Sequence, residues 1–129
     1  MPRDFVRIDA RQFGAGFAIE AAKTQLGVPY KWAGESPETG FDCSGFVLWA
    51  WRHGGKSLPH SSRSMYSMST KISLSQAQPG DLVFYGTSGV SHVALYLGNN
   101  QIIHSPRTGS VVHITSVDYW DALIGVGRV

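Results

Sequence analysis

The feature that most constrains the fold is a change in hydrophobic spacing near residue 78. Before it, apolar residues recur at the three- and four-residue intervals of amphipathic helices, whereas after it they alternate with polar residues, as in half-buried strands. Gly-, Asn- and Pro-rich turns separate five candidate strands, which are DLVFYG, SHVALYLG, QIIHSP, SVVHITS and ALIGVGRV. We therefore predict an α+β fold in which N-terminal helices pack on one side of a five- to six-stranded antiparallel meander.

Two helices are predicted in the first half of the chain. The first covers about residues 16–26 and is followed by a glycine suited to a helix C-terminus. The second begins at Cys43, because Asp42 is a good N-cap, and it ends at a Gly-Gly pair after His53. Between them, GVPYKWAGESPETG is a loop of about a dozen residues, a length that is typical of functional loops.

Length and charge limit the classes of protein to consider. The 129 residues suffice for one domain, so we assign residues 1–14 to an irregular leader and residues 15–129 to the domain. The apolar stretches are shorter than the ~18 residues of a membrane span, and the polar N-terminus lacks the apolar core of a secretory signal. The Lys and Arg residues are scattered instead of forming a basic stripe, so nucleic acid is not an expected partner. We expect a monomer.

Cys43 is the single cysteine of the chain, which excludes an intrachain disulfide and a Cys-rich zinc site. The five histidines form no HExxH motif, so we expect no metal and no cofactor. A lone cysteine is often a buried core residue. The first turn of a helix, however, stabilises a thiolate through its unpaired N–H groups and its dipole. We therefore interpret Cys43 as an activated nucleophile.

A nucleophilic thiol needs a base, and the base needs an orienting partner. The strands SHVALYLG and QIIHSP are joined by a predicted tight turn at residues 98–100. This turn places His104 opposite about residue 94 and therefore close to His92 on the same face of the sheet. One of the two imidazoles can accept the thiol proton while the other fixes its tautomer.

The other three histidines and two further segments give predictions that do not concern the nucleophile. His53 should cap the end of its helix, His60 is a loop residue to which we assign no role, and His113 should face solvent from a strand. A short helix is expected over about residues 62–69. The RTG sequence at residues 107–109 predicts a second tight hairpin.

Five segments in this order and spacing resemble the NlpC family of bacterial cell-wall cysteine peptidases: GVPYKWAG, DCSGFV, LPHSS, QPGDLVFY with SHVALYLGNNQIIHSP, and IGVGRV. The resemblance covers about residues 15–129. It implies a papain-like core in which Cys43 is the nucleophile, His92 the base and His104 the third member of the triad.

The resemblance also implies a substrate, the peptidoglycan stem peptide. Members of this family cleave the bond between γ-D-glutamate and meso-diaminopimelate or L-lysine. Such an enzyme works at the cell wall, outside the cell or in the periplasm, and a targeting domain or partner outside these residues would direct it there.

The resemblance extends to the pocket. Tyr30 would stabilise the oxyanion together with the Cys43 N–H, and Asp42 would bind a substrate amine while also capping the helix. Further pocket residues that it implies are Ser44, Ser62, Ser91, Arg63 and Trp32, the last as a wall of the cleft. The chain departs from the family at Ala33-Gly34, where Gly-Gly is common.

Two alternatives stay open. The same Cys–His site serves N-acetylmuramoyl-L-alanine amidases and acyltransferases, and product analysis would separate these from an endopeptidase. A non-catalytic peptidoglycan-binding module is the other alternative. The presence of all three triad residues weighs against it.

Overall fold

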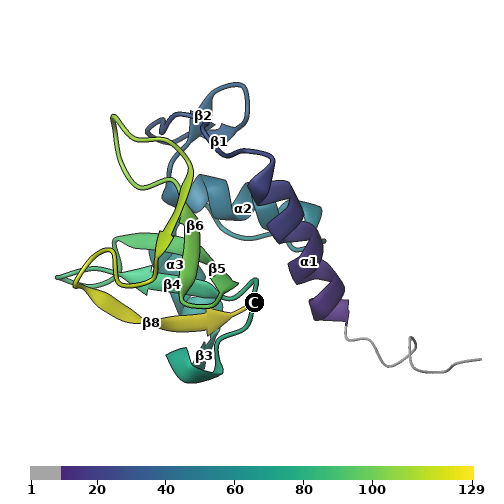
Figure 1. Cartoon of the computed structure of the whole chain (residues 1–129), viewed down its shortest axis with the longest axis vertical. Coiled ribbons are helices and arrows are strands. Elements are labelled where there is room, and N and C mark those ends of the chain that lie inside the picture. The colour runs from purple at the N-terminus through teal and green to yellow at the C-terminus, as the bar shows by residue number, and fades with distance from the viewer. Residues whose placement is uncertain (1–9) are drawn as a thin grey trace, which may run out of the picture.

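The computed structural model describes residues 10–129, with side chains from Gly14 onward, so residues 1–9 of the predicted leader lie outside the described part. Within that part, three α-helices pack on a six-stranded antiparallel sheet, which confirms the predicted α+β class (Figure 1). The helices are α1 (Ala10–Lys23), α2 (Cys43–His53) and α3 (Ser62–Met68). Helix α1 starts earlier than predicted, so residues 10–14 are helical and not irregular as we expected for the leader.

The sheet has the order β3-β8-β4-β5-β6-β7, and a separate two-stranded sheet lies in the loop before α2. Its strands are β3 (Thr70–Ile72), β4 (Leu82–Tyr85), β5 (His92–Gly98), β6 (Gln101–His104), β7 (His113–Ser116) and β8 (Leu123–Arg128). The small sheet pairs β1 (Glu35–Ser36) with β2 (Gly40–Phe41). A 3-10 turn, Leu74–Gln76, precedes β4.

The predicted meander is correct for β4 to β7 but wrong for the last strand. Strand β8 does not pair with β7; it crosses back to pair with β4, where Val126 lies opposite Val83 in the core. The Arg128 guanidinium also donates to both carboxylate oxygens of buried Asp81, at 2.9 Å each. Strand β3, which we did not predict, then pairs with the free edge of β8.

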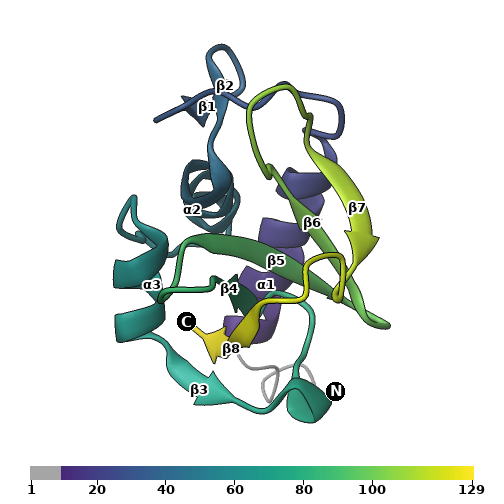
Figure 2. The same ribbon diagram turned by 90° about the vertical axis from the view of Figure 1, so that its left-hand side faces the viewer.

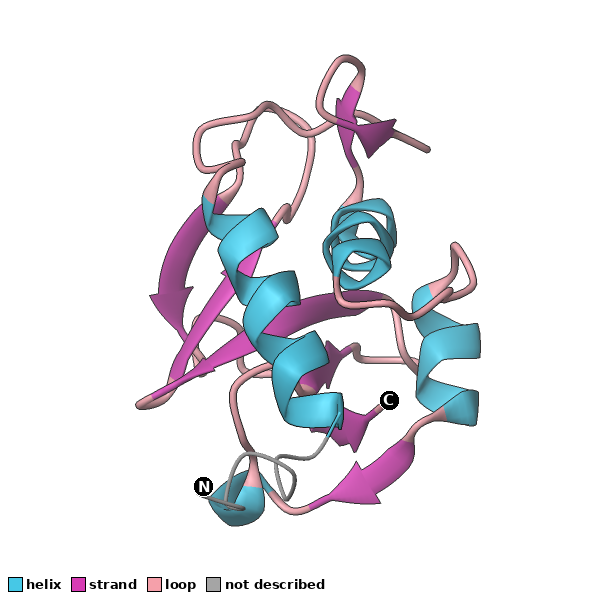
Figure 3. Ribbon diagram, turned by 90° about the vertical axis from the view of Figure 1, so that its right-hand side faces the viewer, coloured by secondary structure: helices cyan, strands magenta, loops and turns pink. Residues whose placement is uncertain are grey.

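Both faces of the sheet are covered, which is why all four residues of β4 are buried. Phe84 and Leu95 belong to the hydrophobic cluster that includes α1 and α2 residues, whereas Tyr85 and Tyr96 belong to a second cluster on the other face. Helices α1 and α2 lie on one side of the sheet (Figure 3). No helix in the described part of the chain is long and apolar enough to cross a membrane.

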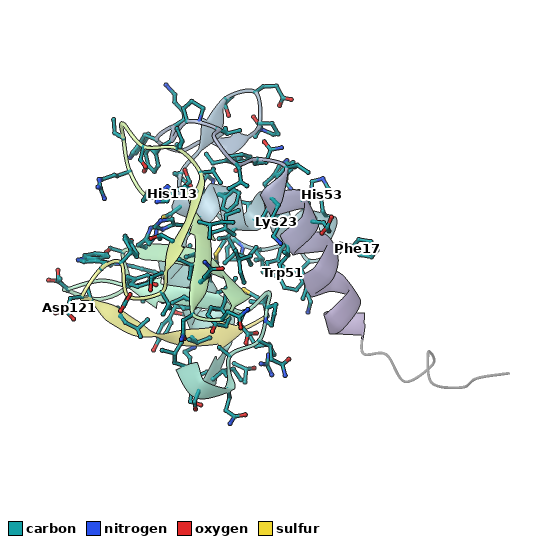
Figure 4. The ribbon with its side chains drawn as sticks, in the orientation of Figure 1. Phe17, Lys23, Trp51, His53, His113 and Asp121 are labelled. Atoms are coloured by element: carbon teal, nitrogen blue, oxygen red, sulfur yellow. The ribbon has the colours of Figure 1, made fainter. Side chains whose placement is uncertain are left out.

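Helix α1 covers α2 with its small, buried alanines, Ala18 and Ala22. Phe17 lies on the opposite face of α1, is 59% exposed and points away from the rest of the domain (Figure 4). The indole Nε1 of Trp51 in α2 donates to the carbonyl of Gly80 at 3.1 Å, and this bond is buried. The helical layer is thus fixed to the start of β4, directly behind the sheet that carries the histidines.

The turn between β5 and β6 confirms the predicted tight hairpin. Gly98, Asn99 and Asn100 all have positive φ, which Gly and Asn adopt most readily. The hairpin pairs Leu95 with Ile103, so His104 continues β6 toward the beginning of β5. The expectation that His104 lies opposite about residue 94 therefore agrees with the register.

The connection between β6 and β7 is not the tight hairpin that we predicted at residues 107–109. Residues 105–112 form a longer loop, because residues 110–112 bond to the segment before α2 and not to β6. Tyr30 N–H donates to Ser110 O and Val112 N–H to Val28 O, both at 2.9 Å. This loop rises beside β1 and β2 in Figure 2 and so joins the two halves of the chain.

Candidate active site

Cys43 is the first residue of α2, as predicted, and Asp42 is its N-cap. The Asp42 Oδ1 accepts a hydrogen bond from Gly45 N–H at 2.6 Å, and the Asp42 N–H donates to Gly34 O at 2.9 Å. A Cβ on Gly45 would lie 1.9 Å from that same Gly34 oxygen. Only glycine therefore lets the preceding loop close against the first turn of the helix.

The thiol of Cys43 lies beside the start of β5, close enough to the Val93 backbone N–H for this group to favour the charged form of the thiol. Burial raises the pKa of the Cys43 thiol, and the Asp42 charge raises it further, while backbone N–H groups of Val93, Ser44 and Cys43 itself act to lower it. Burial outweighs the N–H groups, so the net shift is upward. This direction is opposite to the stabilisation of a thiolate that the position at the helix N-terminus predicts.

The predicted meeting of two histidines is confirmed. His92 Nε2 and His104 Nδ1 are 2.9 Å apart, and the side chains are almost fully buried. Burial lowers the pKa of His92 to about 4. It also lowers the pKa of His104 to about 3, with further contributions from electrostatic repulsion by His92, His113 and Arg107. Both rings are therefore neutral at neutral pH.

The hydrogen bond between the rings determines which nitrogen can act as a base. Among the described residues nothing bonds to His92 Nδ1, so this atom is the free ring nitrogen on the cavity side. A base must be unprotonated, which places the His92 proton on Nε2, from where it is donated to His104 Nδ1. The proton of His104 then sits on Nε2, a buried atom without a hydrogen-bond partner in the described part of the chain.

Cys43 and His92 open into one cavity of about 490 Å³. Its lining residues are Tyr30, Cys43, Ser91, His92, Pro106, Arg107, Tyr119 and Trp120. Tyr30 and Ser91 were predicted as pocket residues and lie there. Burial and the charges of Cys43 and Asp42 raise the pKa of Tyr30, so its hydroxyl stays protonated and can donate.

Sequence reasoning missed four lining residues, which come from two loops late in the chain. Tyr119 packs edge-on to the histidine pair, with ring centroids 4.6 Å from His104 and 5.9 Å from His92. Burial raises its pKa to about 12. The adjacent aromatics in DYW, at residues 118–120, were the available signal for a covering loop, and Arg107 follows directly after the QIIHSP strand.

Other predicted pocket residues lie away from this cavity. Trp32 is 81% exposed and does not line it, contrary to the expected wall of the cleft. Arg63 lies on α3, where its Nε donates to Val90 O at 3.1 Å and ties that helix to the loop before β5. The hydroxyl of buried Ser44 donates to Asp42 at 3.4 Å. Ser62 begins α3.

His60, to which we assigned no role, is a structural neighbour of the nucleophile. Its Nε2 lies 2.8 Å from Asp42 Oδ1 and its Nδ1 lies 2.8 Å from Glu35 Oε2. The imidazole thus links the β1 loop to the N-cap of α2. A substrate amine at Asp42 would have to compete with this contact.

Of the other two histidines, the structure confirms the predicted environment of one and contradicts that of the other. His53 Nδ1 lies 3.0 Å from the Trp49 carbonyl in the last turn of α2, which confirms its capping position. His113 is half-buried and its ring lies 4.8 Å from that of His104, so the prediction that it faces solvent is wrong. The reason is tertiary, since β7 pairs His113 directly with His104.

The sequence model of the NlpC/P60 family matches residues 27–127. The chain is 42% identical over 121 residues to murein DD-endopeptidase MepH of Escherichia coli (strain K12), covering 87% of this chain and 45% of that protein. It is 46% identical over 114 residues to the probable endopeptidase p60 of Listeria innocua, covering 86% and 24%. The chain therefore spans less than half the length of these curated relatives.

A solved structure adds a contrasting relative. RipD of Mycobacterium tuberculosis, described as a non-catalytic NlpC/p60 domain protein adapted to peptidoglycan binding, superposes with a TM-score of 0.80 at 34% identity. The match covers 90% of this chain and 97% of that one. The fold is thus shared by proteins that cut and by at least one that only binds.

Proposed function

This chain belongs to the NlpC/P60 family, and from that premise we propose that it is a peptidoglycan endopeptidase in which Cys43 attacks a stem-peptide amide. One observation carries the proposal: a single cavity exposes the Cys43 thiol and His92, and His104 holds His92 from behind at 2.9 Å. A binding-only module has no need for a buried base aligned in this way. Peptidoglycan as substrate places the protein at the cell wall, outside the cell or in the periplasm.

The reaction begins from a neutral thiol and a neutral imidazole. As the Cys43 Sγ attacks the carbonyl carbon, the thiol proton moves to His92 Nδ1 and a tetrahedral oxyanion forms. Burial disfavours the His92 cation, so this cation exists only while the nearby oxyanion balances it. The His104 Nδ1 accepts the N–H of His92 throughout and keeps the ring in place.

Two donors are available to the oxyanion. The Cys43 N–H points out of the first turn of α2, and the Tyr30 hydroxyl opens into the same cavity. One such donor contributes roughly 2.7–4 kcal/mol to transition-state stabilisation in a well-studied hydrolase.

Collapse of the tetrahedral intermediate breaks the C–N bond. His92 Nδ1 gives its proton to the leaving amine, and the acyl half remains on Cys43 as a thioester. Water then attacks the thioester while His92 accepts a proton from it. The C–S bond breaks, and His92 returns this proton to Sγ, which regenerates the thiol.

The bond that we propose joins γ-D-glutamate to the diamino acid of the stem peptide. A second candidate is a bond between two D-centres, such as the cross-link from D-alanine to diaminopimelate, because a relative at 42% identity is named a murein DD-endopeptidase. In both cases the leaving amine belongs to a diamino acid. The N-acetylmuramoyl-L-alanine amide remains the third bond to consider.

Mass spectrometry of muropeptides treated with the wild-type chain and with Cys43→Ala tests the proposal. A product ending in γ-D-glutamate supports the first bond, and loss of cross-linked dimers without cleavage inside the stem supports the second. Binding of intact peptidoglycan without any Cys43-dependent product would refute the peptidase and favour the binding-only alternative.

A further inference from the structure

One wall of the active-site cavity carries a positive charge that the proposed chemistry does not use. Arg107, in the loop between β6 and β7, lines the same cavity as Cys43 and His92. Its guanidinium makes no hydrogen bond or ion pair with any described residue, and only its backbone carbonyl is engaged, by Ser110 N–H at 3.0 Å. An exposed arginine that is unpaired within a cleft is available to a ligand.

The loop that carries Arg107 is anchored to the segment before α2. Three backbone hydrogen bonds join residues 110–112 to the segment before α2, namely Gly27 N–H to Val112 O, Val112 N–H to Val28 O and Tyr30 N–H to Ser110 O, each at 2.9 Å. The loop therefore reaches the cavity as an anchored element. Figure 1 shows it rising next to the small sheet of β1 and β2.

Arg107 lies on the side of the cavity from which the leaving group departs. His92 has to deliver its proton to the leaving nitrogen, so the amine departs past His92 and not past the helix end at Cys43. Tyr119 packs on both histidines, and Arg107 is close enough for its charge to act on Tyr119 and His104. Arg107 and Tyr119 thus form the wall beside the histidine pair.

The two diamino acids that can form the leaving half differ in charge at the end of the side chain. Meso-diaminopimelate has a carboxylate at the far end of its side chain, whereas L-lysine ends there in an amine alone. Guanidinium binds carboxylate through two parallel hydrogen bonds and repels an ammonium group. Resting on the proposed peptidase function, we propose that Arg107 binds a carboxylate of the leaving diamino acid and makes this chain selective for stems with unmodified diaminopimelate.

The test compares three stem peptides that differ only in the diamino acid: meso-diaminopimelate, its side-chain carboxamide and L-lysine. The wild-type chain should show a kcat/KM about 10- to 100-fold higher for the free carboxylate, as expected for a charged hydrogen-bonded pair. Arg107→Gln should remove the preference by raising KM for that substrate alone, and Arg107→Lys should keep part of it. Lys56→Gln, the same charge change on the exposed loop after α2, should keep the full preference.

Equal rates of the wild-type chain on the free acid and the carboxamide would overturn the inference, as would an Arg107→Gln variant that loses activity equally on all three peptides. Calorimetric binding of the peptides to Cys43→Ala, with and without Arg107→Gln, separates the two proposals. An Arg107-dependent preference in binding without any cleavage by the wild type would support this inference and refute the peptidase. Cleavage without a preference would refute this inference alone.

Discussion

Acidification should destabilise this protein well above the pH at which carboxyl groups ordinarily titrate. Burial lowers the pKa of His92 from 6.5 to about 4 and that of His104 from 6.5 to about 3. Between these values and 6.5 the unfolded chain binds protons that the native state does not bind. Stability therefore rises with pH in this window and is lost as the pH falls below about 6.5.

The magnitude follows from the two shifts. At pH 5 an unfolded histidine with a pKa of 6.5 is almost fully protonated, which favours the unfolded state by about 2 kcal/mol, while the native ring gains almost nothing. Two such side chains give a loss of about 4 kcal/mol between pH 7.5 and pH 5. A typical domain has a free energy of unfolding of about 5–15 kcal/mol, so the loss is large.

Urea denaturation at pH 7.5, 6.5, 5.5 and 5 measures this loss directly. His104→Leu removes one of the two rings and should remove about half of the pH dependence. NMR titration of the His92 ring in the native protein provides a readout that does not depend on unfolding. A free energy of unfolding that stays constant down to pH 5, or a native His92 that titrates near 6.5, would refute the reasoning.

Three further predictions follow from the site. His92→Ala should lower kcat/KM by about 10²- to 10⁴-fold and His104→Ala should lower it by less, because only His92 transfers a proton. A larger loss for His104→Ala than for His92→Ala would mean that the two roles are exchanged. His60→Ala exposes the thiol of Cys43 to the full charge of the N-cap carboxylate, so the midpoint of its iodoacetamide alkylation should shift to higher pH; an unchanged profile would contradict this. Ala33 has φ of 62°, where glycine is favoured, so Ala33→Gly should raise the free energy of unfolding in urea by about 0.5–1 kcal/mol, and a loss would show that the loop is not strained.

The sequence by itself determined the parts of this protein that depend on neighbours a few residues apart. Asp42 caps α2 at Cys43 because the N-cap bonds to an N–H three residues on. The turn at residues 98–100 fixes the register of its two strands, and the register in turn places His104 against His92. Both features could be predicted because a cap and a two-strand hairpin are closed by local geometry.

Tertiary structure decided what depends on contacts between distant segments. It paired β8 with β4, covered the histidines with Tyr119, brought Arg107 to the cavity and placed His60 against a carboxylate 18 residues away. It also buried the Cys43 thiol, and burial raises its pKa against the local effect of the helix N–H groups, because the depth of burial depends on everything packed around the thiol. The local pattern thus identified the reacting residues, and only the packing of the whole chain determined their protonation and the walls of their cavity.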